Sequence, residues 1–486
     1  MSRREYREWR LRRLRHLSIY PSFRHTAHGR IARLPAPLLA TSQVVRLRGC
    51  EFNRLPNGTP SVTLAVSHAG AVPPDSPPSQ PTSMIRPQTV ALLVMLAGCA
   101  PRPDATATAA ALDYLYLWTA SADTTQPDFL AVLDVTEDSA RYGRLVTTLP
   151  IPGSANYPHH TEHELPADRQ LFANGFGSGQ SFVFDLTRPD APRIAAQFGD
   201  VDGYTHPHSF LRLASGNVLA TFQMTHANGH MRAGGLVELT PAGIRVRSSS
   251  ADTPAADSGL RVYSAGIVPL LDRIVTTSTD MEKDFFEPSR TLQVWRLSDL
   301  SLLSSIRLPG PNGTLSAEPR LMADGRTLLV STFSCGLFLI DSLDTDTPRA
   351  SQVGAFPRKD DTSCAIPAIV GHYYLVTVPA WSAVVSLDIS NPRAPKEVSR
   401  VAFDSTDVPH WLSVSPDHRR VVVTGYATME NTVQILRFDE KTGQLALDTR
   451  FREAGATVPG FRMEQKQWPH GGNAKGVPHG AVFSRP

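Results

Sequence analysis

The chain has 486 residues, of which 41% are hydrophobic, and it contains 40 prolines and 33 glycines. This composition excludes a bundle of long helices and favours many short strands joined by turns. The formal net charge of +3 is divided unevenly, because residues 1–83 carry 13 Arg against 4 acidic residues and the remainder has an acidic excess. No basic stripe lies within residues 112–486, so we exclude nucleic acid as a partner of that part.

The first 83 residues are predicted to have no fold of their own. Their cations are all Arg, and they end in a Pro- and Ser-rich run from Ala71 to Thr82. This composition indicates an extension that is either disordered or not part of the native protein. The alternative is a basic arm that binds nucleic acid or anionic lipid.

Residues 84–98 have the features of a lipoprotein-type signal peptide. Met84 and Arg86 precede an apolar run that is too short to span a bilayer. The run ends in Leu96-Ala97-Gly98-Cys99, which resembles a bacterial lipobox. Met84 is then the native start, Cys99 is lipidated, and residues 99–111 are a small-residue tether. We expect a bacterial protein held in the periplasm or cell envelope, with the lipid at Cys99 as its only membrane contact. A buried strand or helix is the alternative for the apolar run.

Residues 112–486 are predicted to form an all-β, seven-bladed β-propeller. Strand-like runs and turns recur with a period of roughly 40–50 residues, as in known propellers. Phe182–Asp185, Leu337–Asp341 and Val385–Asp388 each end a strand in Asp before a Pro-containing turn of closely similar sequence. These marks define six units, at 157–198, 204–248, 260–308, 313–356, 362–403 and 407–452.

The seventh unit combines the two ends of this region. Residues 112–150 hold three predicted strands, and the tail from Pro478 to Ser484 holds one. We expect the tail strand to pair with the three-stranded segment as its innermost member. This pairing closes the ring and removes the exposed sheet edges that invite aggregation.

A Pro-His pair recurs near the start of four innermost strands. The pairs are Pro158-His159, Pro207-His208, Pro409-His410 and Pro478-His479, and His160 directly follows the first pair. The innermost strands of a propeller line its central channel, and units at the two ends of the chain are neighbours in a closed ring. We therefore expect these imidazoles to meet in one arc of blades.

Converging imidazoles favour a transition metal, and flexible all-nitrogen coordination favours copper over zinc. The predicted ligands are His159, His160, His208 and His479, with His410, His206 and His163 as further candidates. Glu162, Glu164 and Glu318 are predicted to accept hydrogen bonds from the imidazoles and so to fix their tautomers. The alternative is that the histidines cap strand starts and bind water in the channel.

Five segments form a series along residues 112–486: Pro158-His159-His160, Val183-Phe184-Asp185, Pro207-His208-Ser209, Gly234-Gly235-Leu236-Val237 and Val433-Gln434-Ile435-Leu436. The series resembles the selenium-binding protein family, which includes methanethiol oxidase. The resemblance implies a copper-dependent oxidase that converts a small thiol and O₂ into an aldehyde, sulfide and H₂O₂. It also implies that His159, His160, His208 and His479 hold the copper. The family's selenium-associated Cys and its Gly-Gly-Asp-Cys ending have no counterpart here, so covalent selenium binding is not expected.

Two other functions stay open from the sequence. The repeated Asp- and Pro-containing turns suit a non-enzymatic, surface-anchored propeller that binds a protein or glycan partner. A lactonase-like or quinoprotein propeller would need carboxylate ligands or a Trp that stacks on a cofactor, for which Trp411 is the candidate. Cys335 ends one strand and Cys364 opens the next unit, so a disulfide and two buried thiols are both compatible with the sequence.

Overall fold

The computed structural model describes residues 112–484, apart from 228–229, 255–256, 258, 282–287, 358–363, 365, 405–407 and 426–431. The predicted extension 1–83, the signal peptide 84–98 and the tether 99–111, which includes Cys99, lie outside the described residues. Among the described residues, no helix has both the length and the apolar character needed to cross a membrane. Three short 3-10 turns occur, η1 (Phe176–Ser178), η2 (Pro269–Leu271) and η3 (Pro379–Trp381).

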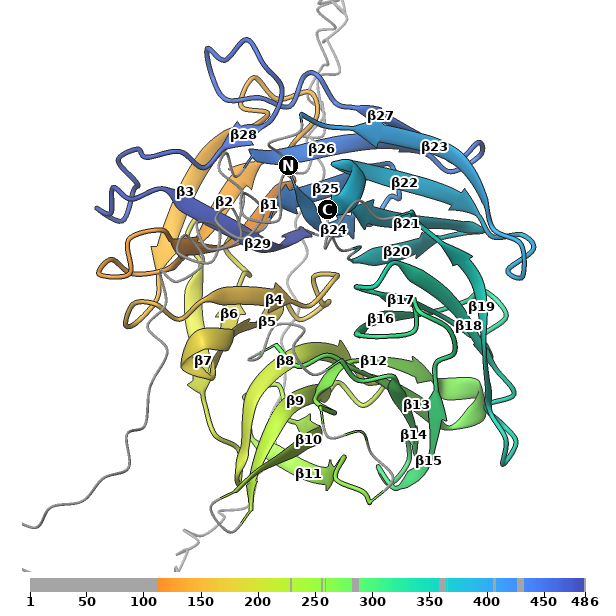
Figure 1. The fold of residues 1–486 in the computed structure, drawn as a ribbon. Coiled ribbons are helices and arrows are strands. Elements are labelled where there is room, and N and C mark those ends of the chain that lie inside the picture. The colour runs from red at the N-terminus through yellow and green to blue at the C-terminus, as the bar shows by residue number, and fades with distance from the viewer. Residues whose placement is uncertain are drawn as a thin grey trace, which may run out of the picture. The chain divides into compact units, whose positions relative to one another are not determined.

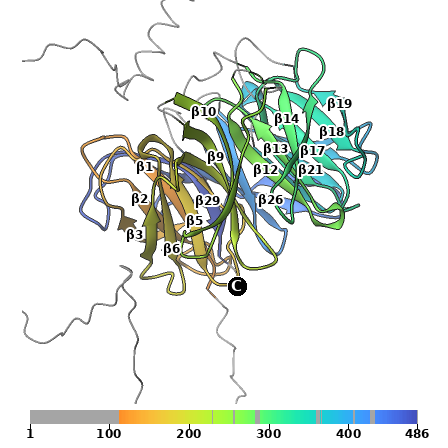
Figure 2. The ribbon, with the colours of Figure 1, turned by 90° about the horizontal axis from the view of Figure 1, so that it is seen from below.

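The described residues form seven antiparallel sheets arranged in a ring, so the predicted seven-bladed β-propeller is confirmed (Figures 1 and 2). Strands are given from the innermost outward. Blade 1 consists of β29 (Gly476–Phe483), β1 (Tyr114–Ser121), β2 (Phe129–Asp134) and β3 (Arg144–Pro150). Blade 2 consists of β4 (Pro158–Thr161), β5 (Gln170–Gly175), β6 (Gln180–Asp185) and β7 (Arg193–Phe198). Blade 3 consists of β8 (Tyr204–Arg212), β9 (Val218–Ala227), β10 (His230–Leu239) and β11 (Arg245–Ser250).

The remaining blades follow the same order. Blade 4 consists of β12 (Val262–Val268), β13 (Arg273–Ser278), β14 (Thr291–Arg296) and β15 (Leu302–Arg307). Blade 5 consists of β16 (Ser316–Leu321), β17 (Leu328–Thr332), β18 (Gly336–Asp341) and β19 (Arg349–Ala355). Blade 6 consists of β20 (Pro367–Val370), β21 (Tyr373–Val378), β22 (Ala383–Asp388) and β23 (Lys396–Ala402). Blade 7 consists of β24 (Pro409–Val414), β25 (Arg420–Gly425), β26 (Thr432–Asp439) and β27 (Gln444–Leu447), and β28 (Phe461–Arg462) pairs with β26.

The central strands of each blade are apolar on both faces, because each sheet packs between two neighbouring sheets. Val421, Val422 and Val423 on β25 are all buried, whereas the outermost strand β7 alternates between exposed and partly buried positions. β-Branched residues suit the pleated surface of such strands. The core is therefore divided into layers of apolar side chains between adjacent blades.

The predicted closure of the ring is also present. β29 pairs antiparallel with β1, with Leu115 opposite Phe483 and Ala120 opposite Val477. Arg420 of blade 7 strengthens this junction, since its guanidinium donates to the backbone carbonyl of Val135 at 2.6 Å and pairs with Asp113. The two ends of the described region thus meet in blade 1.

Cys335 and Cys364 form a disulfide between blades 5 and 6, with their Cα atoms 4.9 Å apart. The bond closes a segment of 29 residues in the unfolded chain. Replacement of Cys335 by Ser is expected to lower the free energy of unfolding by about 3–4 kcal/mol, since the unfolded chain regains the entropy of that loop. Urea unfolding of the oxidised protein measures this loss. A Cys335→Ser variant as stable as the oxidised wild type would contradict the prediction.

Candidate metal centre

The innermost strands carry a β-bulge at the position of the Pro-His pairs. One extra residue is inserted into each of six innermost strands, β4, β8, β12, β16, β24 and β29. In strand order, these insertions lie at or next to His160, His208, Tyr263, Glu318, His410 and His479. A regular strand points successive side chains to opposite faces, and a bulge re-aims one of them. The bulge in β4 explains why His159 and His160 stack on one side, with ring centroids 4.4 Å apart and planes within 8°.

A ladder of threonine hydroxyls holds these bulges in register between blades. Thr277 on β13 accepts from the backbone N–H of Ser264 in its own blade and donates to the backbone carbonyl of Ala317 in the next blade. Thr221 and Thr377 make the same pair of bonds. Thr424 donates to the carbonyl of His479, and Asn174 replaces the hydroxyl in blade 2. These bonds place His208, Tyr263, His410 and His479 at nearly equivalent positions around the axis.

Loss of one ladder hydroxyl should destabilise the ring without removing a histidine. A Thr277→Val variant leaves the N–H of Ser264 and the carbonyl of Ala317 buried without this partner, at a cost of about 1–3 kcal/mol for each group. We expect the free energy of unfolding to fall by about 2–4 kcal/mol. Chemical denaturation measures it, and Thr347→Val, at an exposed turn position, serves as the matched control. Equal stability of the two variants would show that the ladder adds nothing.

Five imidazoles meet at the centre of blades 7, 1, 2 and 3, and we call them the histidine cluster: His159, His160, His208, His410 and His479. The ring centroids of His159 and His479 are 4.2 Å apart, and those of His160 and His208 are also 4.2 Å apart. His410 lies 4.7 Å from His479. Segments 320 residues apart in the sequence are therefore in contact. A hydrogen bond from Nδ1 of His479 to the backbone carbonyl of His159, 2.5 Å long, also joins them.

Burial keeps the cluster neutral. His159, His160, His208 and His479 are at most 1% exposed, and His410 is partly exposed. Burial, followed by the neighbouring imidazoles, lowers the pKa of His159 and His160 well below the usual value for histidine. Burial lowers the pKa of His208 to about 3. Neutral imidazoles are the form that binds metal.

One member of the cluster, His479, has a tautomer that its hydrogen bond defines. Nδ1 of His479 donates to a backbone carbonyl, so its Nε2 carries the lone pair. Nδ1 of His208 lies 3.1 Å from Oγ of Ser209, and Nε2 of His208 is buried without a hydrogen-bond partner among the described residues. Nε2 of His479 and Nε2 of His208 are therefore candidate ligand atoms.

Glu318 on β16 faces the cluster from the far side of the channel. Its Oε1 lies 3.8 Å from Nδ1 of His160, and its Oε2 accepts from Ser264 at 2.8 Å and Arg320 at 2.9 Å. Burial alone would raise the pKa of Glu318, but Arg320 and His163 hold it well below its usual range. A buried carboxylate thus stays ionised beside neutral imidazoles, but at 3.8 Å it lies beyond hydrogen-bond distance of His160, so the predicted hydrogen bond is not formed.

The other predicted residues lie around the cluster and not within it. His163 stacks on Trp411 at 4.4 Å and accepts from Arg320 at 2.9 Å. His206 is partly exposed, beside Phe176. Glu162 pairs with Arg212 at 2.7 Å and accepts from a backbone N–H, and Glu164 is exposed. Trp411 is buried and donates its indole N–H to the carbonyl of Ala481, so it is packed within the fold and not laid open for a cofactor.

Tyr263 is a member of the site that the sequence analysis missed. Its ring centroid lies 3.8 Å from that of His208, and its hydroxyl lies 3.5 Å from Nε2 of His160. Burial and the charge of Glu318 raise the pKa of Tyr263 well above its usual value, so the phenol stays protonated. Val262 precedes it in place of Pro, which hid its equivalence to the histidines; alignment of the Ser209 and Ser264 positions would have shown it.

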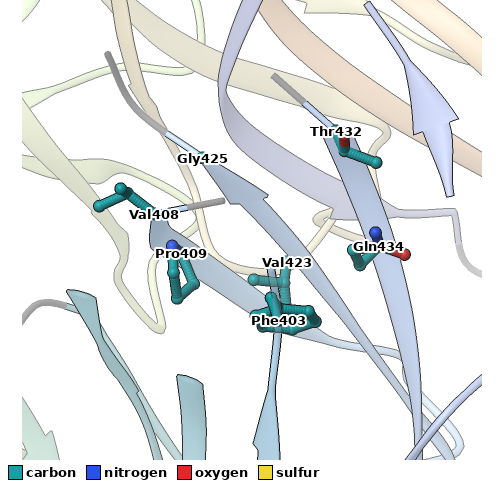
Figure 3. Close-up of a pocket in the computed structure, with 7 residues that line it drawn as sticks. All are labelled: Phe403, Val408, Pro409, Val423, Gly425, Thr432 and Gln434. Carbon is teal, nitrogen blue, oxygen red and sulfur yellow. The ribbon is translucent and has the colours of Figure 1, made fainter. Parts of the chain in front are cut away.

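A small pocket lies beside the start of β24 (Figure 3). It is partly open to solvent and is lined by Phe403, Val408, Pro409, Val423, Gly425, Thr432 and Gln434. Pro409 directly precedes His410, the partly exposed member of the cluster. None of the five cluster histidines lines this pocket.

Neither a protein-family model nor a curated protein sequence matches the chain. Its structure is similar to that of a hypothetical selenium-binding protein from Sulfolobus tokodaii, with a TM-score of 0.64 and 16% identity, over 77% of this chain and 93% of the other. It is also similar to a periplasmic gluconolactonase from Pseudomonas aeruginosa, with a TM-score of 0.55 and 14% identity, over 77% of this chain and 99% of the other. At these identities the likenesses show a shared β-propeller fold.

Proposed function

We propose that this protein is a copper-dependent oxidase of small thiols, similar to methanethiol oxidase, with the metal held by the histidine cluster. The observation that carries the proposal is the convergence of five imidazoles from four blades. The selenium-binding protein among the structural neighbours supports it weakly, at 16% identity. The cell envelope is the proposed location, since the disulfide and a lipid anchor at Cys99 both suit an oxidising compartment.

The residues of the cluster fit copper. The donor set is entirely imidazole nitrogen, which suits copper, and zinc is second. Nε2 of His208 is a buried polar atom without a protein partner among the described residues, as expected of a ligand atom. Glu318 supplies a negative charge beside the cluster, which offsets part of the cost of placing a cation there.

The chain's own residues would bind the reactants and limit their kind. When bound, copper supplies the one-electron chemistry that links a thiol to O₂. Aromatic rings of Phe176, Tyr263 and Trp411 surround the imidazoles and exclude bulk water. Burial of the cluster favours small neutral reactants, because a charged group would lose its hydration on entry. Glu318 would place a negative charge beside His160, and Tyr263 would support the ring of His208 by packing against it.

The test is copper binding combined with oxygen uptake. We expect the purified full chain to retain copper after desalting and to consume one O₂ for each methanethiol oxidised, with H₂O₂ and sulfide as products. Protein that retains no copper, or copper-loaded protein that takes up no O₂ with methanethiol, would contradict the proposal. His418→Asn is the matched control, because His418 is half-exposed in the hairpin after β24 and has a positive φ that Asn tolerates.

A further inference from the structure

The histidine cluster contains two groups of ligands. The metal-binding atoms of His159, His160 and His208 lie within 4.8 Å of one another, and we call this set the inner triad. Those of His159, His410 and His479 also lie within 4.8 Å of one another, and we call this set the outer triad. His159 is the one member common to both. The five residues do not form a single group at this distance among the described residues.

This arrangement does not suit one ion. A metal–imidazole bond is about 2.0–2.1 Å long, so two nitrogens on one ion lie no more than about 4.2 Å apart. The metal-binding atoms of the five residues are not all within 4.8 Å of one another, so one ion cannot bind all five as they are placed. Each triad by itself gathers three imidazoles, with His160 and His208 in one and His410 and His479 in the other.

We propose that the cluster binds two copper ions, one in each triad, with His159 between them. This inference rests on the proposed function and adds a second ion to it. The residues of the inner triad are at most 1% exposed, whereas the outer triad includes the partly exposed His410, so we expect the outer ion to be the more accessible of the two. An imidazole has two nitrogens, so His159 can contact both ions.

Two ions match the electron count of the proposed reaction. Conversion of CH₃SH, O₂ and H₂O into CH₂O, H₂S and H₂O₂ removes two electrons from the carbon and reduces O₂ by two electrons. The C–S bond breaks, sulfur leaves as H₂S, and water provides the oxygen of the aldehyde. When bound, two copper ions would supply two one-electron changes, which matches this electron count without a separate reductant.

Copper stoichiometry of the full chain tests the inference. The probe is Cu(I), added without O₂ to metal-free protein, with unbound metal removed by desalting. We expect two ions per chain in the wild type and in His418→Asn, one in His208→Ala, one in His410→Ala, and none in the double variant. His208→Phe keeps an aromatic ring against Tyr263 and is the second variant at that position. Circular dichroism and the Tm identify any variant that does not fold.

The outcomes separate this inference from the proposed function. A wild type with one ion, lost from either single variant, would overturn the two-ion site and leave the oxidase proposal standing. A wild type without copper would overturn both. Two ions retained by the double variant would show that the metal binds elsewhere and would also overturn both.

Accessibility gives a second readout. A soluble Cu(I) chelator is expected to remove the two ions in two phases, with the outer ion leaving first. His410→Ala should keep only the slow phase, and His208→Ala only the fast one. A single phase with equal rates in both variants would contradict the distinction between the triads.

Discussion

A chain that stops after Lys475 is expected to lose cooperative folding. This change removes β29, so β1 keeps a row of unpaired backbone groups at an open edge. It also removes Ala481, Val482 and Phe483, which are at most 1% exposed. Burial of a Val or Phe side chain stabilises a fold by about 1.5–3 kcal/mol each. The summed loss reaches a large part of the 5–15 kcal/mol typical of domain stability.

Thermal unfolding followed by circular dichroism and size-exclusion chromatography measures this effect. The matched control is a chain that stops after Ser484, because it keeps all of β29. An Arg420→Met variant tests the same junction with one side chain, and loss of a buried ion-pair partner costs about 3–5 kcal/mol. A chain ending at Lys475 that unfolds with the wild-type Tm and amplitude would refute closure by β29.

The metal-free protein is expected to lose stability steeply as the pH falls from 7 to 5. The folded state holds His159, His160, His208 and His479 neutral, because their pKa values lie below the usual value near 6.5. Below pH 6.5 the unfolded chain therefore binds more protons than the folded one, so stability rises with pH and falls on acidification. Each such histidine lowers the free energy of unfolding by up to about 2 kcal/mol as the pH falls from 7 to 5.

Urea unfolding at pH 7.5, 6.5 and 5.5 measures the slope. Copper should move the loss to lower pH, because it binds the folded state and competes with protons for the same nitrogens. His208→Phe should reduce the slope by the share of one histidine, and His418→Asn should leave it unchanged. A stability that does not vary with pH in the metal-free protein would show that the imidazoles have the same pKa in the folded and unfolded states, which would contradict their burial in the neutral form.

The blades could be predicted from the sequence because their signals are local. Each Asp-ended strand and its Pro-containing turn marks a unit, and the predicted unit 157–198 matches β4 to β7, which span Pro158 to Phe198. Closure of the ring could be predicted from the lone strand at the end of the chain. Convergence of the histidines could then be predicted as well, because the innermost strands of a closed ring all line the same central channel.

The inner details could not be predicted, because they depend on contacts between blades. Whether Glu162 or Glu318 faces an imidazole is decided by the neighbouring strand: Glu162 finds Arg212, and Glu318 finds Ser264 and Arg320 across the channel. The threonine ladder joins each hydroxyl to a backbone carbonyl 33 to 55 residues further along the chain, so no local pattern marks it. Tyr263 was hidden because Val262, and not Pro, precedes it.

Copper K-edge X-ray absorption of the loaded protein tests the central claim most directly, since it reports the atoms bound to the metal. Convergence of the imidazoles predicts a shell of about three nitrogens at roughly 2.0 Å with the outer scattering of imidazole rings. It also predicts no sulfur at about 2.3 Å, because Cys335 and Cys364 are joined in the disulfide. A shell of oxygen atoms without imidazole scattering, or a sulfur ligand in the absence of thiol, would contradict a histidine-bound metal at the centre of the ring.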